Sequence, residues 1–151
     1  LYDFTSYDQF VIDLEIIAEV NPDYDVTILS RLPTRRWIEK IDLSKINNYW
    51  IDIVAKAGVK IKSVEVCPHR DEENCDCRKP KTGLLIAAEK KLNITLEGCY
   101  FVGDKLSDLE CAIAHGCKPV LVKTGYGTRT YESTFPEESL VFENKSSLNI
   151  C

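Results

Sequence analysis

Short apolar runs alternate with segments of helical periodicity along the 151 residues, and no other feature constrains the fold as strongly. A β-branched apolar run is typical of a strand covered on both faces, whereas apolar residues three and four apart mark one face of a helix. Strands are predicted at 26–29, 59–66, 99–102, 119–122 and 140–142, and helices at 8–20, 43–57, 82–92 and 106–116. This alternation predicts a single α/β domain over residues 1–151 with a mostly parallel sheet.

Residues that follow the strands are candidates for a binding site, because ligands in such sheets bind beyond the carboxyl ends of the strands. These positions are Ser30, the loop that begins at Cys67, Gly103-Asp104 and Lys123–Gly125. Gly103 is predicted to allow a tight turn that leaves Asp104 at the end of its strand.

Composition narrows the class of protein. The net charge is −5, which argues against a general nucleic-acid or acidic-membrane surface. The first ten residues have neither a basic start nor an apolar block, so no secretory signal is visible. Seven cysteines, an odd number, argue against a disulfide framework and for reduced thiols. We therefore expect a cytoplasmic protein.

Four metal-type ligands fall within eleven residues of the sequence "CPHRDEENCDC". Cys67 and His69 form one i, i+2 pair and Cys75 and Cys77 form another, so each pair points to one side of an extended backbone. Three thiolates and one imidazole predict a closed, structural zinc site. The alternative interpretations are unrelated thiols beside a surface histidine, or a nucleic-acid zinc ribbon, which the acidic linker "RDEEN" opposes.

Charged residues of both signs accompany this cluster. Arg78 and Lys79 follow Cys77 directly, and a guanidinium fork beside an ammonium suits a phosphate group, although solvated surface cations are the alternative. Asp104 and Asp108 lie four residues apart at the start of a predicted helix. Carboxylates there suit Mg²⁺ with a phosphate substrate, whereas helix capping is the simpler explanation.

Together, "CPHRDEENCDCRKPKTG", "FVGDKLSDLECA" and "VLVKTGYG" resemble the haloacid dehalogenase (HAD) superfamily. Within it the resemblance is to the D-glycero-D-manno-heptose 1,7-bisphosphate 7-phosphatases and the related histidinol-phosphate phosphatases, and it extends from about residue 9 to residue 143. It implies a three-layer, Rossmann-like sheet with helices on both faces, a structural Zn²⁺, a catalytic Mg²⁺ and an aspartyl-phosphate intermediate.

The resemblance also implies roles for single residues. Ser30 matches the residue that hydrogen-bonds the transferred phosphoryl group, and Lys79 matches the lysine that neutralises it. Asp104 matches the Mg²⁺ ligand, with Asp108 supporting the metal site. Contacts to the substrate are implied for Arg78, Lys79, Lys105 and, in the divergent turn "SRLPT", Arg31.

One part of the family pattern is not recognisable. Phosphatases of this superfamily begin with an apolar strand that ends in D-x-D-G-T, whose aspartates are the nucleophile and the acid/base. The string Asp23-Tyr24-Asp25-Val26-Thr27 has the right letters, but it precedes its strand, so its carboxylates would lie at the wrong end of the sheet. We therefore expect this N-terminal strand to be lost from the sequence or supplied by another segment, and the 151 residues alone to lack phosphatase activity.

The function implied is phosphomonoester hydrolysis of a sugar phosphate in carbohydrate metabolism, most specifically the heptose bisphosphate used for lipopolysaccharide precursors. The alternatives are a non-catalytic zinc-containing domain that binds a sugar phosphate and, within the enzyme class, a histidinol-phosphate phosphatase. The partner expected is a small molecule rather than nucleic acid or a membrane, and a monomer is compatible with the small size of the chain.

Overall fold

The computed structural model describes residues 25–31, 48, 51–52, 55–56, 60–69 and 71–143, with the side chains of 25–31 and 71 left out of the description. The chain forms two compact units, residues 1–75 and 76–151. The predicted helix at 8–20 lies outside the described residues. The prediction of a single domain remains a prediction.

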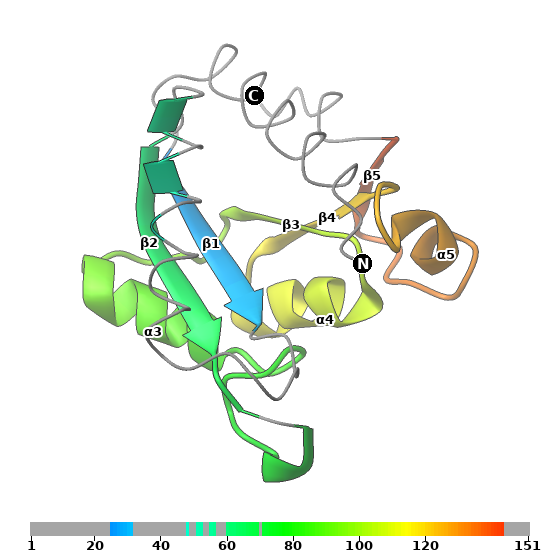
Figure 1. The fold of residues 1–151 in the computed structure, drawn as a ribbon. Helices are drawn as coiled ribbons and strands as arrows, with labels where there is room; N and C mark the ends of the chain where they lie inside the picture. The colour runs from blue at the N-terminus through cyan, green and yellow to red at the C-terminus, as the bar shows by residue number, and fades with distance from the viewer. Residues whose placement is uncertain are drawn as a thin grey trace. The chain divides into compact units, whose positions relative to one another are not determined.

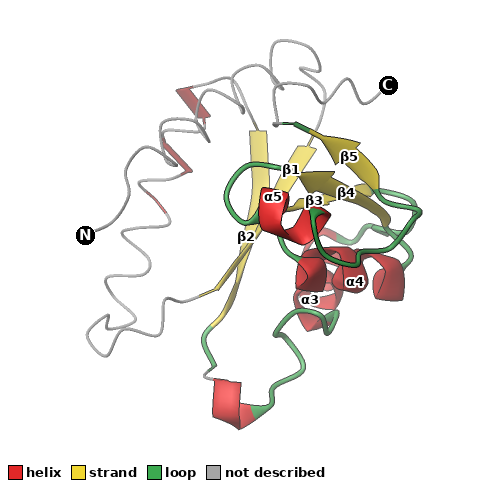
Figure 2. Ribbon diagram, turned by 90° about the vertical axis from the view of Figure 1, so that its right-hand side faces the viewer, coloured by secondary structure: helices red, strands yellow, loops and turns green. Residues whose placement is uncertain are grey.

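The first unit contains a two-stranded parallel sheet. Strand β1 (Asp25–Arg31) pairs with β2 (Lys60–Cys67), and Figure 1 shows the two arrows side by side, pointing the same way. Ser30 lies opposite Val66, so both strands end at the same edge. The short 3-10 helix η1 (Asp71–Glu73) follows in the loop after β2 (Figure 2). Residues 48, 51–52 and 55–56 are helical, in agreement with the helix predicted at 43–57.

The second unit begins with α3 (Gly83–Leu92) and contains a three-stranded parallel sheet in the order β3-β4-β5. Its strands are β3 (Tyr100–Gly103), β4 (Lys118–Val122) and β5 (Leu140–Phe142). Helix α4 (Leu106–His115) packs against β3 and β4 (Figure 1). The buried core of this unit is formed by Leu84, Leu85, Ala88, Phe101, Leu109, Cys111, Ala112, Cys117, Val120, Leu121 and Val122.

The ends of the helices follow from local sequence. Helix α3 ends at Asn93 and α4 at Gly116, and both C-caps adopt the left-handed conformation, with φ of 53° and 81°. Glycine adopts this conformation without steric cost. None of the described helices is long and apolar enough to cross a membrane.

The α/β fold with parallel strands is confirmed, because every strand pair in the described residues is parallel. The described strands form a two-stranded sheet in residues 1–75 and a three-stranded sheet in residues 76–151. One feature differs from the prediction. A short helix, α5 (Gly127–Tyr131), was not predicted (Figure 2), since "GTRTY" combines a glycine with β-branched residues that have low helix propensity.

Candidate active site

The end of β3 brings a glycine and a buried carboxylate into direct contact. Gly103 was predicted to permit a tight turn, and it is the last residue of β3, three positions before α4 begins at Leu106. A Cβ at this position would collide with the Cβ of Asp108 and lie 2.6 Å from its Oδ2. Glycine is therefore required because Asp108 packs directly against the strand.

Asp108 is engaged at both carboxylate oxygens. Its Oδ2 accepts a hydrogen bond from the backbone N–H of Lys105 at 3.1 Å, which satisfies one donor at the start of α4. Its Oδ1 lies 2.5 Å from Nζ of Lys79. The Asp108 side chain is 5% exposed and the Lys79 side chain 26% exposed, so the carboxylate is buried and the ammonium reaches solvent. Helix capping, the simpler explanation of this position, accounts for one of its two oxygens.

Asp104 has different surroundings. It is half-buried, and its Oδ2 accepts a hydrogen bond from the backbone N–H of Tyr126 at 2.9 Å. Its carbonyl oxygen accepts a bond from the Thr130 hydroxyl at 2.8 Å. Gly125 has a φ of 60°, and a Cβ there would collide with Oδ2 of Asp104. The loop after β4 thus supports Asp104, a role that the "KTGYG" sequence did not reveal beyond its place at a strand end.

The segment that carries Lys79 is fixed by backbone and thiol contacts. The N–H of Lys81 donates to the carbonyl of Arg78 at 2.9 Å, and the N–H of Gly83 donates to the carbonyl of Asp76 at 3.0 Å. The Cys111 thiol donates to the Lys81 carbonyl at 3.4 Å. Burial raises the pKa of Cys111 to about 11, so this thiol stays protonated and available as a donor at neutral pH.

Lys105 lies at the rim of a shallow pocket of about 360 Å³ that is also lined by Tyr126, Arg129 and Ser133. Its Nζ lies 4.2 Å from the centroid of the Tyr126 ring, a cation–π distance. The predicted substrate contact at Lys105 is thus on an exposed surface next to Asp104.

The four predicted zinc ligands lie together. The ligand atoms of Cys67, His69, Cys75 and Cys77 are all within 4.8 Å of one another, and Cys67 is buried. The sulfurs of Cys67 and Cys75 are 3.6 Å apart, too far for a disulfide bond, and Cys67 Sγ lies 3.9 Å from Nδ1 of His69. Such a donor set could hold a metal ion.

For the other predicted site residues the structure describes less than the full set of contacts. Ser30 and Arg31 are the last two residues of β1, opposite Val66 and Cys67, and their side chains lie outside the description. Arg78 is half-buried in the segment after the cysteine cluster. Asp25 is the first residue of β1, so the D-x-D-x-T string overlaps the amino end of the strand at residues 25–27 rather than preceding it.

A magnesium ion requires oxygen ligands, and the two aspartates differ in what they can offer. Asp104 uses Oδ2 for the Tyr126 N–H, and Oδ1 has no partner among the described residues. Both oxygens of Asp108 already have partners. The donor set therefore fits Mg²⁺ at Asp104.

Comparison with known proteins gives the class. The chain has a parallel α/β fold, with Asp104 directly after β3 and the Lys79–Asp108 pair beside it. Residues 76–144 match the HAD-hydrolase-like family, so these are the fold and the site of a HAD-type hydrolase. A solved structure of D,D-heptose 1,7-bisphosphate phosphatase from B. bronchiseptica is 30% identical, with a TM-score of 0.78 over 88% of this chain and 76% of that one. The chain belongs to the HAD-type hydrolase family, as the resemblance predicted.

Two curated relatives are also similar. The D-glycero-beta-D-manno-heptose-1,7-bisphosphate 7-phosphatase of Pseudomonas putida is 48% identical over 96 residues, which are 64% of this chain and 55% of the relative. The enzyme of the same name from Pseudomonas aeruginosa is 42% identical over 97 residues, 64% of this chain and 54% of the relative. The chain thus spans about half the length of these relatives.

Proposed function

We propose that the protein is a phosphomonoester hydrolase that removes the 7-phosphate of D-glycero-D-manno-heptose 1,7-bisphosphate. The observation that carries the proposal is the Lys79–Asp108 pair beside Asp104 at the end of β3, in a chain whose relatives bear the name of this activity. The heptose substrate is favoured over histidinol phosphate because the relatives named here act on the heptose.

In the proposed reaction an aspartate carboxylate oxygen bonds to phosphorus while the bond from phosphorus to the sugar oxygen breaks. An acid protonates the leaving sugar oxygen, and water then hydrolyses the acyl phosphate and releases inorganic phosphate. We assign neither the nucleophile nor the acid to a described residue. Lys79 and Ser30 hold the oxygens of the transferring phosphoryl group, and Arg78, Lys105 and Arg31 contact the substrate.

Two metals belong to the proposal. Mg²⁺, when bound, would neutralise phosphate charge, and Asp104 would be its ligand in this chain. Zn²⁺ would be held by Cys67, His69, Cys75 and Cys77, which would fix the loop that leads into Arg78 and Lys79. A location in the cytoplasm is proposed with them, because clustered thiolates need a reducing compartment.

The test uses the full product of the gene that encodes these residues. With Mg²⁺ present we expect phosphate release from the heptose bisphosphate, with phosphorus NMR showing loss of the 7-phosphate and retention of the 1-phosphate. Histidinol phosphate is the control substrate. Tight binding of the bisphosphate in calorimetry without phosphate release would instead support the non-catalytic binding domain.

A further inference from the structure

We propose that the hydroxyl group of Thr130, in helix α5, positions Asp104 for Mg²⁺, an inference that rests on the proposed role of Asp104 as the magnesium ligand. Thr130 is a positioning residue in this proposal, because it acts on the metal only through Asp104. It lies 26 residues after Asp104, in a helix that the sequence did not predict, so no motif connects the two.

The Thr130 hydroxyl is buried and makes a bond to another element of the fold. Thr130 is 8% exposed, and its Oγ1 lies 2.8 Å from the carbonyl oxygen of Asp104 and 3.3 Å from that of Tyr126. A threonine inside a helix commonly bonds the carbonyl four residues earlier, which here is that of Tyr126. A hydroxyl has one proton to donate, and the shorter distance assigns it to Asp104.

One segment therefore holds Asp104 at its backbone and at its side chain. The Thr130 hydroxyl binds its carbonyl, and the N–H of Tyr126 donates to its Oδ2 at 2.9 Å. Tyr126 directly precedes α5, so both donors belong to this helix and its cap. Because the two bonds fix the carbonyl and one carboxylate oxygen, they limit how far the side chain can turn. Oδ1 of Asp104 is thereby presented to a metal ion in one orientation.

Helix α5 has no room to shift toward β4. A Cβ on Gly127, the first residue of α5, would collide with the carbonyl oxygen of Val122, the last residue of β4. The Thr128 hydroxyl also donates to the carbonyl of Lys123 at 3.0 Å. The donors that hold Asp104 thus come from a helix that is fixed to the end of β4.

The end of β4 is fixed in turn to the end of β5. The N–H of Lys123 donates to the carbonyl of Phe142 at 2.9 Å, and its Nζ lies 2.8 Å from Oε1 of Glu143. The same ammonium lies 3.8 Å from the centroid of the ring of Tyr131, the last residue of α5. Lys123 therefore contacts both α5 and the end of β5, which adds a second anchor for the helix.

Metal binding should be sensitive to this support because Mg²⁺ demands near-ideal octahedral geometry. Removal of a group that orients a metal ligand typically lowers metal affinity or activity about 10–100-fold. Loss of the Thr130 hydroxyl should therefore weaken metal binding although no ligand atom is removed. The expected signature is a loss of activity that added Mg²⁺ restores.

The experiment compares two variants of the full gene product. Thr130→Val keeps the shape of the side chain without the hydroxyl, and Thr130→Ser keeps the hydroxyl. Electron paramagnetic resonance measures binding of Mn²⁺, which prefers the same oxygen ligands as Mg²⁺. We expect Thr130→Val to raise the Kd for Mn²⁺ about 10–100-fold and Thr130→Ser to bind Mn²⁺ as the parent does. Asp104→Asn should abolish the binding that Thr130→Val weakens.

The matched control is Thr128→Val, which makes the same change two positions earlier in α5. Thr128 is exposed, and its hydroxyl binds the Lys123 carbonyl instead of Asp104, so Mn²⁺ affinity should not change. Parent-like Mn²⁺ affinity in Thr130→Val, or an equal loss in Thr130→Ser or Thr128→Val, would overturn the inference. Mn²⁺ binding that survives Asp104→Asn would overturn it as well.

Kinetics separates this inference from the proposed function. With the heptose bisphosphate, Thr130→Val should need about 10–100-fold more Mg²⁺ for half-maximal activity, while its kcat at saturating Mg²⁺ approaches that of the parent. If the parent hydrolyses no phosphate ester, the proposed function fails, and Mn²⁺ binding alone decides the inference. If the parent is active and Thr130→Val needs no additional Mg²⁺, only the inference fails. Should Thr130→Val not fold, Thr130→Ala, which is smaller and also lacks the hydroxyl, replaces it with the same expected results.

Discussion

The two ends of α4 carry the same kind of contact. At the amino end Asp108 pairs with Lys79, and at the carboxyl end His115 pairs with Glu89, whose Oε1 lies 3.2 Å from the histidine Nε2. Each pair joins α4 to the segment that precedes β3. Both are also partly buried, yet their surroundings differ.

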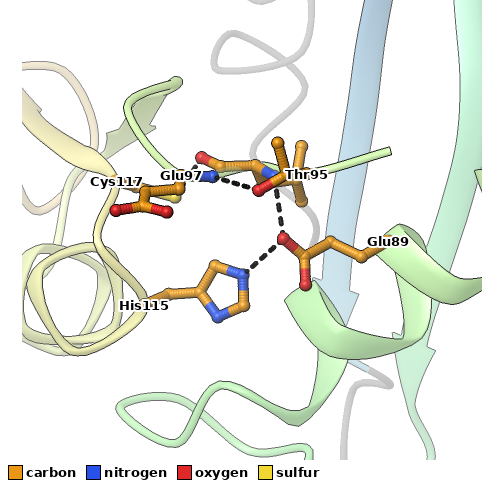
Figure 3. A network of polar contacts seen from close by, with 6 residues as sticks. Glu89, Thr95, Glu97, His115 and Cys117 are labelled. Carbon is orange, nitrogen blue, oxygen red and sulfur yellow. Dashed lines mark hydrogen bonds and ion pairs between the residues drawn. The ribbon is translucent and has the colours of Figure 1, made fainter. Parts of the chain in front are cut away.

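At the carboxyl end several polar groups bond to one another (Figure 3). Oε1 of Glu89 accepts the N–H of Leu96 at 2.8 Å, and the Cys117 thiol donates to the Leu96 carbonyl at 3.2 Å. Burial raises the pKa of Cys117 to about 11, so the thiol remains a donor. The N–H of Glu97 donates to the Thr95 hydroxyl in the same loop.

At the amino end the pairing is incomplete. The Lys79 ammonium retains exposed surface, and Asp104 keeps one oxygen without a partner among the described residues. The comparison teaches that a pair of polar side chains alone does not mark a functional site. What distinguishes the amino end is its place at the carboxyl end of a parallel strand, where ligands bind.

The largest effect is expected from Lys79→Ala, which should lower kcat/KM about 10²–10³-fold, in the range seen when one donor to developing charge is removed. Lys81→Ala is the matched control, because the Lys81 ammonium makes an exposed ion pair with Asp76 at 3.4 Å, and such pairs contribute little. Steady-state kinetics with the heptose bisphosphate checks both. Equal losses in the two variants would show that the Lys79 ammonium has no special role at the amino end of α4.

Loss of the metal cluster should have the next largest effect. Elemental analysis should find about one zinc per chain, as expected of a closed site with four protein ligands. Cys77→Ser should remove the zinc and weaken calorimetric binding of a sugar bisphosphate about 10–100-fold, because Cys77 continues directly into Arg78 and Lys79. Cys99→Ser, an exposed cysteine outside the cluster, is the control and should retain zinc. If folded, zinc-free Cys77→Ser bound the sugar bisphosphate as tightly as the parent protein does, the loop would have only a structural role.

The glycines beside the two ends sharpen the comparison further. Gly103→Ala should destabilise the fold by about 1–3 kcal/mol through overpacking against Asp108. Gly116→Ala should cost a similar amount, about 1–2 kcal/mol, because its φ of 81° is unfavourable for alanine. Urea unfolding measures both. Only Gly103→Ala should also lower kcat/KM. If Gly116→Ala lowered kcat/KM by the same factor, the functional difference between the two ends of α4 would be contradicted.

Every described element of the second unit except α5 could be predicted from the sequence, because each has a local signal. Helix α4 shows apolar residues at helical spacing and a terminal glycine, and the β-branched "PVLV" becomes β4. The cluster of candidate zinc ligands was equally local, since its four residues lie within eleven positions of the sequence. Residue spacing alone is enough to predict such a cluster, because the chain folds back on itself within a few residues.

The division of tasks between Asp104 and Asp108 could not be predicted in this way. The string "GDKLSD" places both near the start of a helix, but it does not encode that Lys79, 29 positions before Asp108 in the sequence, packs against one of them. Nor does it encode the support of Asp104 by the N–H of Tyr126. The close packing of Asp108 against Gly103 could not be predicted either, because a glycine needed for close packing and one needed for a turn look identical in a sequence.

The smallest effect is expected at the carboxyl end of α4, from Glu89→Gln. The bond from the Leu96 N–H, and then the pair with His115, hold the pKa of Glu89 below its ordinary value of 4.5. A carboxyl group whose pKa is lowered by folding stabilises the protein above its unfolded pKa, and this contribution is lost as the pH falls through the folded pKa. The urea midpoint of Glu89→Gln should therefore lie slightly below that of the parent at neutral pH, and the difference should shrink as the pH falls below about 4.5. Activity at neutral pH should not change, because Glu89 and His115 meet at the opposite end of α4 from Lys79 and Asp108. A loss of kcat/KM that exceeds the change in stability would show that the two ends of α4 are coupled rather than separate.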